Sequence, residues 1–324
     1  MSKESSKSPV SLVNSVPVSI FYQRTQKSLH LSLVAGESGL SESIGDKTLN
    51  RPALALTGYW EYFGHKRIQL FGAGEMGYLR HLPDSQQRLV LEEMVQKHVP
   101  CLVISRGLEP TPAMQAVADA HNTPLFRTEM DTRDFAAKAT LELEELFAPS
   151  TVEHGTMMDV KGIGTLIRGE SGLGKSECAL ALIDRGYSLV ADDMVHVKLL
   201  NEYELMATSA ELNRNYMECR GIGIINIAEL FGIGATRLQK HIDLVVTLIE
   251  WKPGMEVDRT GLEENFYTIL DQEVPHIVIP VRSGRDLGQL VEVAAMVQAL
   301  KMIGHHPARD FNERLIAQMD KGQK

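Results

Sequence analysis

The sequence has no segment long and apolar enough to cross a membrane as one helix. Its longest apolar stretches, such as residues 242–249, are far shorter than the roughly 20 residues that such a helix needs. The N-terminal segment mixes polar residues into its apolar part and has no convincing cleavage site, so we expect no signal peptide. The three cysteines, Cys101, Cys178 and Cys219, are odd in number and share no metal-ligand spacing. Free thiols in a cytoplasmic protein are the simplest interpretation.

Runs of basic residues are also absent, and the formal net charge is −9 at pH 7. A protein whose main partner is nucleic acid would carry a basic stripe or face, so this balance argues against nucleic acid. It does not exclude a nucleotide, because a single loop can hold phosphate in an acidic protein. The length of 324 residues favours two domains of ordinary globular composition.

Strand-like and helix-like segments alternate in the first half of the chain. We expect strands at 67–71 and 101–105, and helices at 86–98 and 131–147. Pro149 disfavours helical backbone at the residue before it. We therefore place a domain boundary there, which gives an N-terminal α/β domain of residues 1–148 and a C-terminal domain of residues 149–324.

The second half opens with a strand, a glycine-rich loop, a helix and another strand. The strands are predicted at 164–168 and 187–191, and the helix at 175–185 with Gly186 as its C-terminal cap. This order favours an α/β core. Further strands are expected at 244–250 and 276–281, followed by helices at 287–302 and 309–320.

The pentapeptide Gly-Glu-Ser-Gly-Leu occurs twice, and its second copy completes the pattern G-x-x-x-x-G-K-[ST] of a phosphate-binding loop. In such a loop, glycines let backbone N–H groups form a concave nest and the next helix presents unpaired N–H groups. The lysine reaches the terminal phosphates and the serine hydroxyl binds Mg²⁺. We expect a nucleotide site rather than an inert turn at Gly169, Glu170, Ser171, Gly172, Leu173, Gly174, Lys175 and Ser176.

The first copy, at residues 36–43, lacks this chemistry. Ser41 stands in place of the second glycine, and Glu42 in place of the lysine would repel phosphate. We predict a surface loop there. A G-x-G-x-x-G pattern at residues 72–77 follows a predicted strand, but Pro83 shortens the next helix and no acidic residue ends the next strand. A tight strand-to-helix turn is the favoured interpretation, with dinucleotide binding as the alternative.

Asp192 and Asp193 close the strand that follows the loop helix. Ligands of open α/β sheets bind at the carboxyl ends of strands, so at least one of these carboxylates should face the terminal phosphate. Two roles compete, Mg²⁺ ligand or base for an attacking hydroxyl, and a solvated turn is the alternative.

Several segments together resemble the HPr kinase/phosphorylase family. They are VEHG at 152–155, GESGLGKSECALALIDRGYSLVADD at 169–193, MECRGIGIINI at 217–227, PVRSGR at 280–285 and ARDFNERL near the C-terminus. The resemblance is specific over residues 150–318 and looser in the N-terminal half. It implies an N-terminal α/β domain and a C-terminal P-loop kinase domain that resembles phosphoenolpyruvate carboxykinase and ends in helices.

The resemblance also implies an activity. Enzymes of this family use ATP and Mg²⁺ to phosphorylate a regulatory serine of HPr, the small phosphocarrier protein of the bacterial sugar phosphotransferase system. They reverse the modification with inorganic phosphate and release pyrophosphate, and they assemble as hexamers. HPr is thus the expected substrate partner of this chain.

By the same resemblance, Asp193 matches the aspartate that takes the serine proton and returns it in reverse. A raised pKa would suit both roles, and Asp192 as a like-charged neighbour could help raise it. Lys175 matches the phosphate cradle, and Ser176 and Glu218 match the Mg²⁺ ligands. The remaining site residues that the resemblance implies are His154 and Arg259 for the transferring phosphate, Arg282 and Arg285 for the reverse reaction, and Asp192 and Arg220.

Two other functions stay open. The first is a small-molecule kinase or a carboxykinase-like enzyme on the same fold, and the second is a nucleotide-binding regulator that transfers nothing. A pure switch does not need a base, so Asp193 beside the loop favours an enzyme. For the N-terminal domain, partner contact and assembly are both plausible. His305 and His306 lack a third nearby ligand, so we expect a polar turn between helices rather than a metal site.

Overall fold

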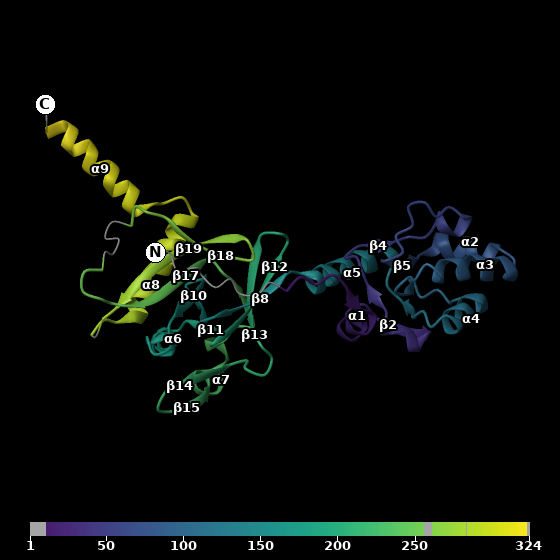
Figure 1. The fold of residues 1–324 in the computed structure, drawn as a ribbon, viewed down its shortest axis with the longest axis horizontal. Coiled ribbons are helices and arrows are strands. Elements are labelled where there is room, and N and C mark those ends of the chain that lie inside the picture. The colour runs from purple at the N-terminus through teal and green to yellow at the C-terminus, as the bar shows by residue number, and fades with distance from the viewer. Residues whose placement is uncertain (1–10, 256–260, 283, 323–324) are drawn as a thin grey trace. The chain divides into compact units, whose positions relative to one another are not determined.

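The computed structural model describes residues 11–255, 261–282 and 284–322. The chain forms two compact units, and Figure 1 shows a mixed α/β arrangement in each. The first unit is Leu12–Ala148. The second runs from Pro149 onward and includes Ser11, whose backbone pairs with that of Ser150.

A five-stranded sheet lies at the centre of the N-terminal unit, in the order β2-β7-β6-β5-β4. Strands β4 to β7 are parallel and β2 is antiparallel to β7. Their bounds are β2 (Leu31–Ala35), β4 (Leu49–Asn50), β5 (Ile68–Phe71), β6 (Leu102–Ile104) and β7 (Leu125–Thr128). A short pair, β1 (Val16–Pro17) and β3 (Ser43–Ile44), stands beside it.

Helices cover both faces of this sheet because its strands are apolar on both sides. Phe71, Leu102 and Ile104 pack with α2 (Ala73–His81), α3 (Asp84–Val95) and α4 (Pro112–Ala120). Ile68, Leu70 and Val103 face the other way, toward α1 (Val18–Thr25) and α5 (Thr132–Phe147). The unit is therefore a three-layer sandwich, and β5 and α2 join at Gly72 in the tight strand-to-helix turn that the sequence favoured.

The C-terminal unit contains two larger sheets. The six-stranded sheet has the order β11-β9-β10-β17-β19-β18, and the four-stranded sheet has the order β16-β13-β12-β8. The bounds of the first are β9 (Thr156–Val160), β10 (Ile163–Gly169), β11 (Ser188–Ala191), β17 (Leu244–Glu250), β18 (Asn265–Ile269) and β19 (Gln272–Val281). Those of the second are β8 (Ser150–His154), β12 (Met194–Leu200), β13 (Glu204–Ser209) and β16 (Gln239–His241).

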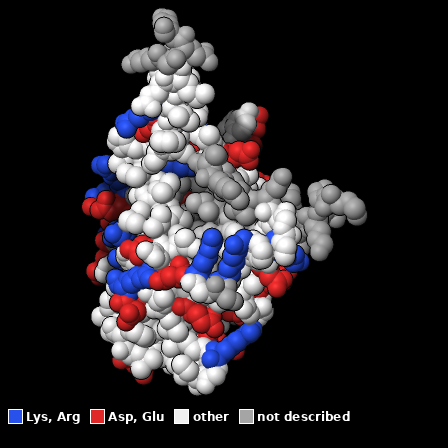
Figure 2. Space-filling view, turned by 90° about the vertical axis from the view of Figure 1, so that its left-hand side faces the viewer, with Lys and Arg blue, Asp and Glu red and all other residues white. Residues whose placement is uncertain are grey.

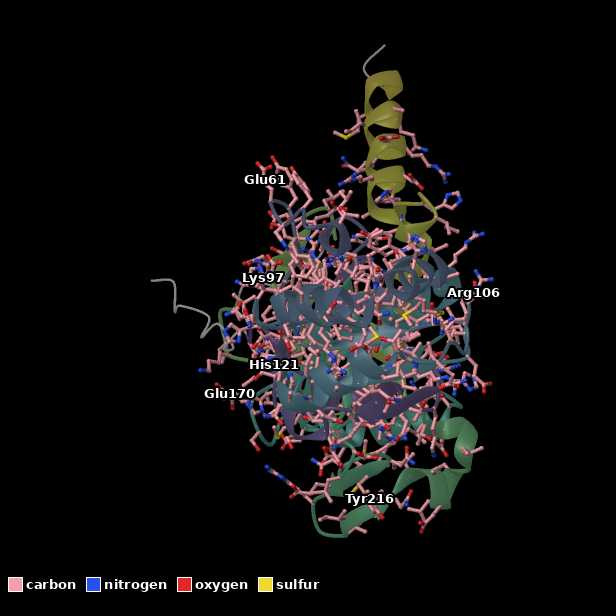
Figure 3. All side chains as sticks on the ribbon, turned by 90° about the vertical axis from the view of Figure 1, so that its right-hand side faces the viewer. Glu61, Lys97, Arg106, His121, Glu170 and Tyr216 are labelled. Atoms are coloured by element: carbon pink, nitrogen blue, oxygen red, sulfur yellow. The ribbon has the colours of Figure 1, made fainter. Side chains whose placement is uncertain are left out.

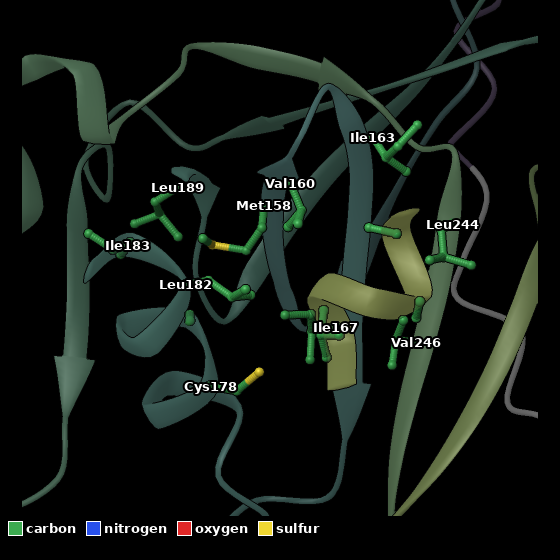
Figure 4. Packing of buried hydrophobic residues seen from close by; sticks show 14 of the residues in the cluster. Met158, Val160, Ile163, Ile167, Cys178, Leu182, Ile183, Leu189, Leu244 and Val246 are labelled. Atoms are coloured by element: carbon green, nitrogen blue, oxygen red, sulfur yellow. The ribbon is translucent and has the colours of Figure 1, made fainter. Parts of the chain in front are cut away.

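The six-stranded sheet is buried between helices and the other sheet. On one face, Ile167 and Val246 pack with α6 (Lys175–Asp184) and α8 (Leu287–Met302). Figure 4 shows Cys178 and Leu182 of α6 turned toward these strands. On the other face, Leu166 and Val245 pack with β12 and β13. A hairpin, β14 (Tyr216–Cys219) and β15 (Gly223–Asn226), leads into α7 (Ile227–Phe231), and α9 (Pro307–Gly322) follows α8.

Most of the elements that the sequence predicted lie within one to three residues of the observed bounds, but strands such as β8, β9 and β12 to β16 were not predicted. Helix α8 and strand β17 have the predicted bounds, and α3 begins two residues before the predicted start. Gly186 has φ +90 after α6 and ends that helix as predicted. The three cysteines are free and buried. Within the described ranges no single helix is long and apolar enough to span a membrane, and one pair, Leu287–Met302 with Pro307–Met319, meets that test only across a 73° bend.

The first pentapeptide copy forms the predicted surface loop, with residues 37, 38 and 41–43 exposed, but its two glycines are packed against the protein. Gly36 opens a short 3-10 turn at Glu37–Gly39, and Gly36 and Gly39 are both buried. A Cβ on Gly36 would lie 2.0 Å from the Thr123 carbonyl oxygen, so only glycine fits there. The Gly36 N–H donates to the Asp119 carboxylate at 2.7 Å. This backbone N–H is therefore already bonded and is not available to a phosphate oxygen.

Helix α5 offers a test of which positions hold the N-terminal unit together. Leu143 is fully buried, whereas Leu141 on the same helix is 62% exposed. We expect Leu143→Ala to lower the free energy of unfolding by about 2–5 kcal/mol, because it removes buried methyl groups and leaves a cavity. Leu141→Ala should change it by less than about 0.5 kcal/mol. Denaturant unfolding of the full chain measures both, and equal effects would contradict the packing described.

Candidate active site

The residues that the sequence singled out gather at one edge of the six-stranded sheet. Strands β10, β17 and β19 are parallel neighbours, so their carboxyl ends meet at that edge. Strand β9 is antiparallel to both β10 and β11, so β11 ends there too. The glycine-rich loop follows β10, the aspartate pair follows β11, and PVRSGR begins with the last two residues of β19 and continues beyond it. The prediction that loop and aspartates share an edge is confirmed, although an antiparallel strand separates β10 from β11.

The loop from Gly169 to Gly174 is tightly packed at its base and closed by its own lysine. A Cβ on Gly169 would lie 2.6 Å from the carbonyl oxygen of Leu248 on β17, so this position needs glycine. The Lys175 ammonium donates to the carbonyl oxygens of Gly169 and Glu170, at 2.8 and 3.1 Å. The lysine thus spans the loop, and α6 starts directly behind it.

The β14–β15 hairpin adds a second cation to the loop. Arg220 lies in its turn, and its Nη2 donates to the Ser171 hydroxyl at 2.6 Å. Its Nη1 would stand 3.3 Å from a Cβ on Gly172. The guanidinium therefore lies against the middle of the loop. Two cations, Lys175 and Arg220, contact the segment where the motif predicts phosphate oxygens.

Asp192 is held firmly at the end of β11. Its carboxylate accepts a hydrogen bond from the Thr156 hydroxyl at 2.7 Å, and further bonds from the backbone N–H groups of Glu218 and Asp193. Burial raises the pKa of Asp192 and the charge of Asp193 adds to the rise, although the three hydrogen bonds act the other way. The carboxylate thus connects β9, β11 and β14.

Asp193 has the opposite environment. It is exposed and has φ +63, a left-handed conformation that aspartate tolerates better than most residues. The chain turns here from β11 in one sheet to β12 in the other. Because the three donors around Asp192 occupy that carboxylate, Asp193 is the member of the pair that is accessible to a ligand at this edge.

His154 lies beside this turn. It ends β8 and pairs across the ladder with Met194, the residue after Asp193. The next residue, Gly155, donates its N–H to the carbonyl oxygen of Asp193 at 3.1 Å. The histidine is exposed, so its ring can reach a ligand held at this edge.

The segment after β19 also reaches the loop. The Arg282 guanidinium stacks on the Trp251 ring at 3.7 Å, and Trp251 directly follows β17. Leu287, the first residue of α8, has its Cδ1 3.4 Å from where a Cβ on Gly174 would stand. Arg285 is exposed between these two contacts. Arg259, which the sequence also predicted here, lies outside the described residues.

Sequence analysis missed a charged network just below this edge. Arg168 precedes Gly169, and its Nη2 pairs with the buried Glu153 carboxylate at 3.3 Å. The guanidinium stacks on the Tyr267 ring at 4.2 Å, and the Tyr267 hydroxyl donates to Glu153 at 3.2 Å. The sequence did hold a signal for a buried ion pair. Arg168 is a charged residue at the end of an apolar strand, and Glu153 points to the opposite face of its strand from its neighbour His154. The network links the strands that carry the loop and the histidine.

The predicted metal ligands suit Mg²⁺ chemically. In the described part of the chain, no group of three or more His, Cys, Asp and Glu side chains is arranged as a metal site. Ser176 and Glu218 offer oxygen atoms alone, and β14, which carries Glu218, packs against α6, which carries Ser176. Mg²⁺ favours such oxygen ligands, commonly one or two from protein together with waters and substrate phosphates. The residues therefore fit a magnesium ion shared with a nucleotide.

Comparison with known proteins identifies the family. The model described as "HPr Serine kinase N terminus" matches residues 16–143, and "HPr Serine kinase C-terminal domain" matches residues 145–315. The chain belongs to the HPr kinase/phosphorylase family. The resemblance drawn from the sequence is therefore confirmed, and it extends over the N-terminal half, where the sequence motifs were looser.

Individual members of the HPr kinase/phosphorylase family match nearly the whole chain. The HPr kinase/phosphorylase of Geobacter sulfurreducens is 41% identical over 310 residues, covering 95% of this chain and 97% of that protein. That of Leptospira biflexa is 42% identical over 294 residues, covering 90% and 91%. A solved structure, the Hpr(Ser) kinase/phosphatase from Coxiella burnetii, is 34% identical, covers 50% of this chain and 99% of that chain, and has a TM-score of 0.45.

The raised pKa of Asp192 predicts a pH-dependent stability. The pKa of Asp192 in the folded protein exceeds the ordinary value of 3.8, so folding favours the protonated carboxyl group. Its contribution to the free energy of unfolding is therefore complete below pH 3.8 and is lost as the pH rises through the folded-state pKa. Asp192→Asn removes this dependence. Relative to the parent, the variant should therefore gain stability as pH rises from about 4 to neutrality. Thermal unfolding across this range tests it, with exposed Asp184→Asn as control, and parallel profiles for parent and Asp192→Asn would contradict it.

Proposed function

We propose that this protein phosphorylates a regulatory serine of HPr with ATP and Mg²⁺, and removes that phosphate with inorganic phosphate. The observation that carries the proposal is the shared edge, where the cationic loop after β10 and the exposed Asp193 after β11 lie together. Membership of the HPr kinase/phosphorylase family supports the same conclusion, since relatives of nearly equal length carry that name.

In the kinase direction, the backbone amides of the loop, Lys175 and Arg220 hold the ATP phosphates. Asp193 accepts the proton of the substrate serine hydroxyl, whose oxygen attacks the γ-phosphorus while the bond from that phosphorus to the β–γ bridging oxygen breaks. ADP leaves with the electron pair of that bond. The accessibility of Asp193 supports its role as base.

In the reverse direction, inorganic phosphate attacks the phosphorus of phosphoserine. The bond from phosphorus to the serine oxygen breaks, Asp193 returns the proton to that oxygen, and pyrophosphate forms. One carboxylate serves both directions because acid and base roles exchange when a step is reversed. Arg282 and Arg285 suit the incoming phosphate, because guanidinium groups bind phosphate oxygens through paired hydrogen bonds.

The remaining site residues assist these steps. His154, beside the Asp193 turn, orients phosphate or the aspartate, and Arg259 stabilises charge on the transferring group. Ser176 and Glu218 would hold Mg²⁺, which, when bound, neutralises negative charge on the phosphates. ATP, phosphate and pyrophosphate are the co-substrates and product that this arrangement implies.

The same proposal extends to setting and partners. We infer a cytoplasmic homohexamer that acts on HPr, with a P-loop domain related to that of phosphoenolpyruvate carboxykinase and an N-terminal unit that serves assembly or partner contact. Nucleic acid and membrane are not expected partners. On the face shown in Figure 2, basic and acidic side chains are interspersed, which supports a protein partner over a polyanion.

Asp193→Asn tests the chemistry. The variant should lose about 10²-fold or more of serine phosphorylation and of its reversal, because the amide cannot accept the proton, while ATP still binds. Incubation with HPr and Mg-ATP, then with phosphate, measures both directions, and nucleotide titration measures binding. Asp271→Asn is the matched control, since Asp271 is also exposed with positive φ but lies before β19, at the opposite edge.

The outcomes of that experiment separate the alternatives. Unchanged transfer by Asp193→Asn would remove the proposed base. If the parent ignores HPr but phosphorylates a free hydroxy compound or turns over phosphoenolpyruvate, it is a small-molecule enzyme. If it binds ATP and transfers to nothing, it is a nucleotide-binding regulator.

Arg285→Gln tests the division of labour between the two directions. We expect it to slow phosphate-dependent dephosphorylation about tenfold while changing kinase rate by less than threefold, because the lost charge faces the phosphate attacker. Lys161→Gln, which removes an exposed charge at the β9–β10 turn, is the control. Equal losses in both directions would assign Arg285 to ATP rather than to inorganic phosphate.

A further inference from the structure

The N-terminal unit has an open cleft of its own, lined by residues to which the proposed catalysis gives no role. Its volume is about 870 Å³, within the range of small-molecule sites. It lies where β4, β5 and β6 end, and the residues that follow these three strands line it: Arg51, Ala73 with Gly74, and Arg106. Its position is therefore the carboxyl edge of a parallel sheet.

The helices around the cleft explain why it exists. Helix α2 leaves β5 and packs on one face of the sheet, through Met76 and Leu79. Helix α5 packs on the other face, through Phe135 and Ala139, and also contacts β5. The first turns of α2 and α5 thus diverge across the sheet edge. Ligands of open α/β sheets bind in such crevices.

Three arginines from three separate segments reach this cleft. Arg51 donates through Nε and Nη2 to the buried Glu75 carboxylate, at 3.0 and 2.9 Å, which fixes its guanidinium. Arg106, labelled in Figure 3, pairs with Asp131 at 3.1 Å through Nη2. Arg133, in the first turn of α5, has no ion pair among the described residues. Since a guanidinium carries five N–H donors, each arginine keeps donors for a ligand.

The remaining lining suits a small organic anion better than a dinucleotide. Asp131 and Asp134 also line the cleft and Glu75 pairs with Arg51, so the three arginines stand beside three carboxylates, two of which are already paired with Arg51 and Arg106. Beyond β6, where a dinucleotide site would place an acid for the ribose, the chain has Ser105 and Arg106. Leu49 and Leu70 supply an apolar wall, and Gly74 leaves open space at the start of α2.

We propose that this cleft binds a small organic anion that bears a phosphate ester or a carboxylate. The arginines bind the oxyanion, with the N–H groups of the first turns of α2 and α5 beside them, and the apolar wall takes the carbon skeleton. The G-x-G turn at Gly72 and Gly74 thereby has a use that the catalytic proposal does not give it. The site is contained in Leu12–Ala148 and does not depend on the proposed catalysis.

Hydrogen exchange of the full-length protein, followed by mass spectrometry, tests this. The probes are phosphoglycolate and malonate at millimolar concentration, one a phosphate ester and the other a dicarboxylate. We expect protection at residues 72–77 and 131–136 with at least one probe, which separates this cleft from the loop at 169–176. No protection there with either probe overturns the proposal.

A matched pair of variants assigns the effect to the cleft. Arg133→Gln should raise the midpoint of the protection titration about tenfold, because it removes an unpaired charge from the oxyanion site. Arg88→Gln removes an exposed arginine that pairs with Asp84 on α3, outside the cleft, and should leave the midpoint unchanged. Equal midpoints for Arg133→Gln and the parent overturn the proposal, and circular dichroism with thermal unfolding of both variants reports whether the fold is intact.

Discussion

The direction of the strands in the six-stranded sheet is the constraint on which the site depends. Because β10, β11, β17 and β19 all end at one edge, segments more than 100 residues apart in sequence lie together there. Antiparallel β9, placed between β10 and β11, sets the spacing between the glycine-rich loop and the aspartates. Asp192 then ties this edge to β14 through hydrogen bonds, so the loop, the aspartate pair and the hairpin with Arg220 are connected to one another.

The loop, the helix behind it and several strands could be predicted from the sequence, because each is specified by a short run of consecutive residues. The loop motif specifies its own backbone and the helix behind it, and apolar periodicity located the longer helices and several buried strands. The position of Asp193 at the shared edge could be predicted because this aspartate follows the strand that comes directly after the loop helix. The family resemblance supplied His154, Glu218 and the arginines as candidates. None of these residues stands in a sequence pattern that would have singled it out without the resemblance.

The features that could not be predicted from the sequence are contacts between residues that are far apart in the chain. Nothing in the run of residues at 152–168 tells that Glu153 and Arg168 meet each other and Tyr267 between two sheets. Nor does it tell which aspartate is buried, since the answer lies in donors from Thr156 and Glu218. The buried glycines of the first pentapeptide copy have the same explanation, because the Asn122–Pro124 backbone that covers them is distant in sequence.

The contact of Lys175 with two carbonyl oxygens has a consequence for how nucleotide enters. The ammonium already donates hydrogen bonds to two backbone carbonyl oxygens. A phosphate that binds Lys175 would therefore replace these bonds, and the lysine would not gain its first partner. The affinity that this side chain adds is then the difference between its interaction with phosphate and its interaction with the two carbonyl oxygens. The same two bonds brace the loop, because they join its first two carbonyl oxygens to the first residue of α6.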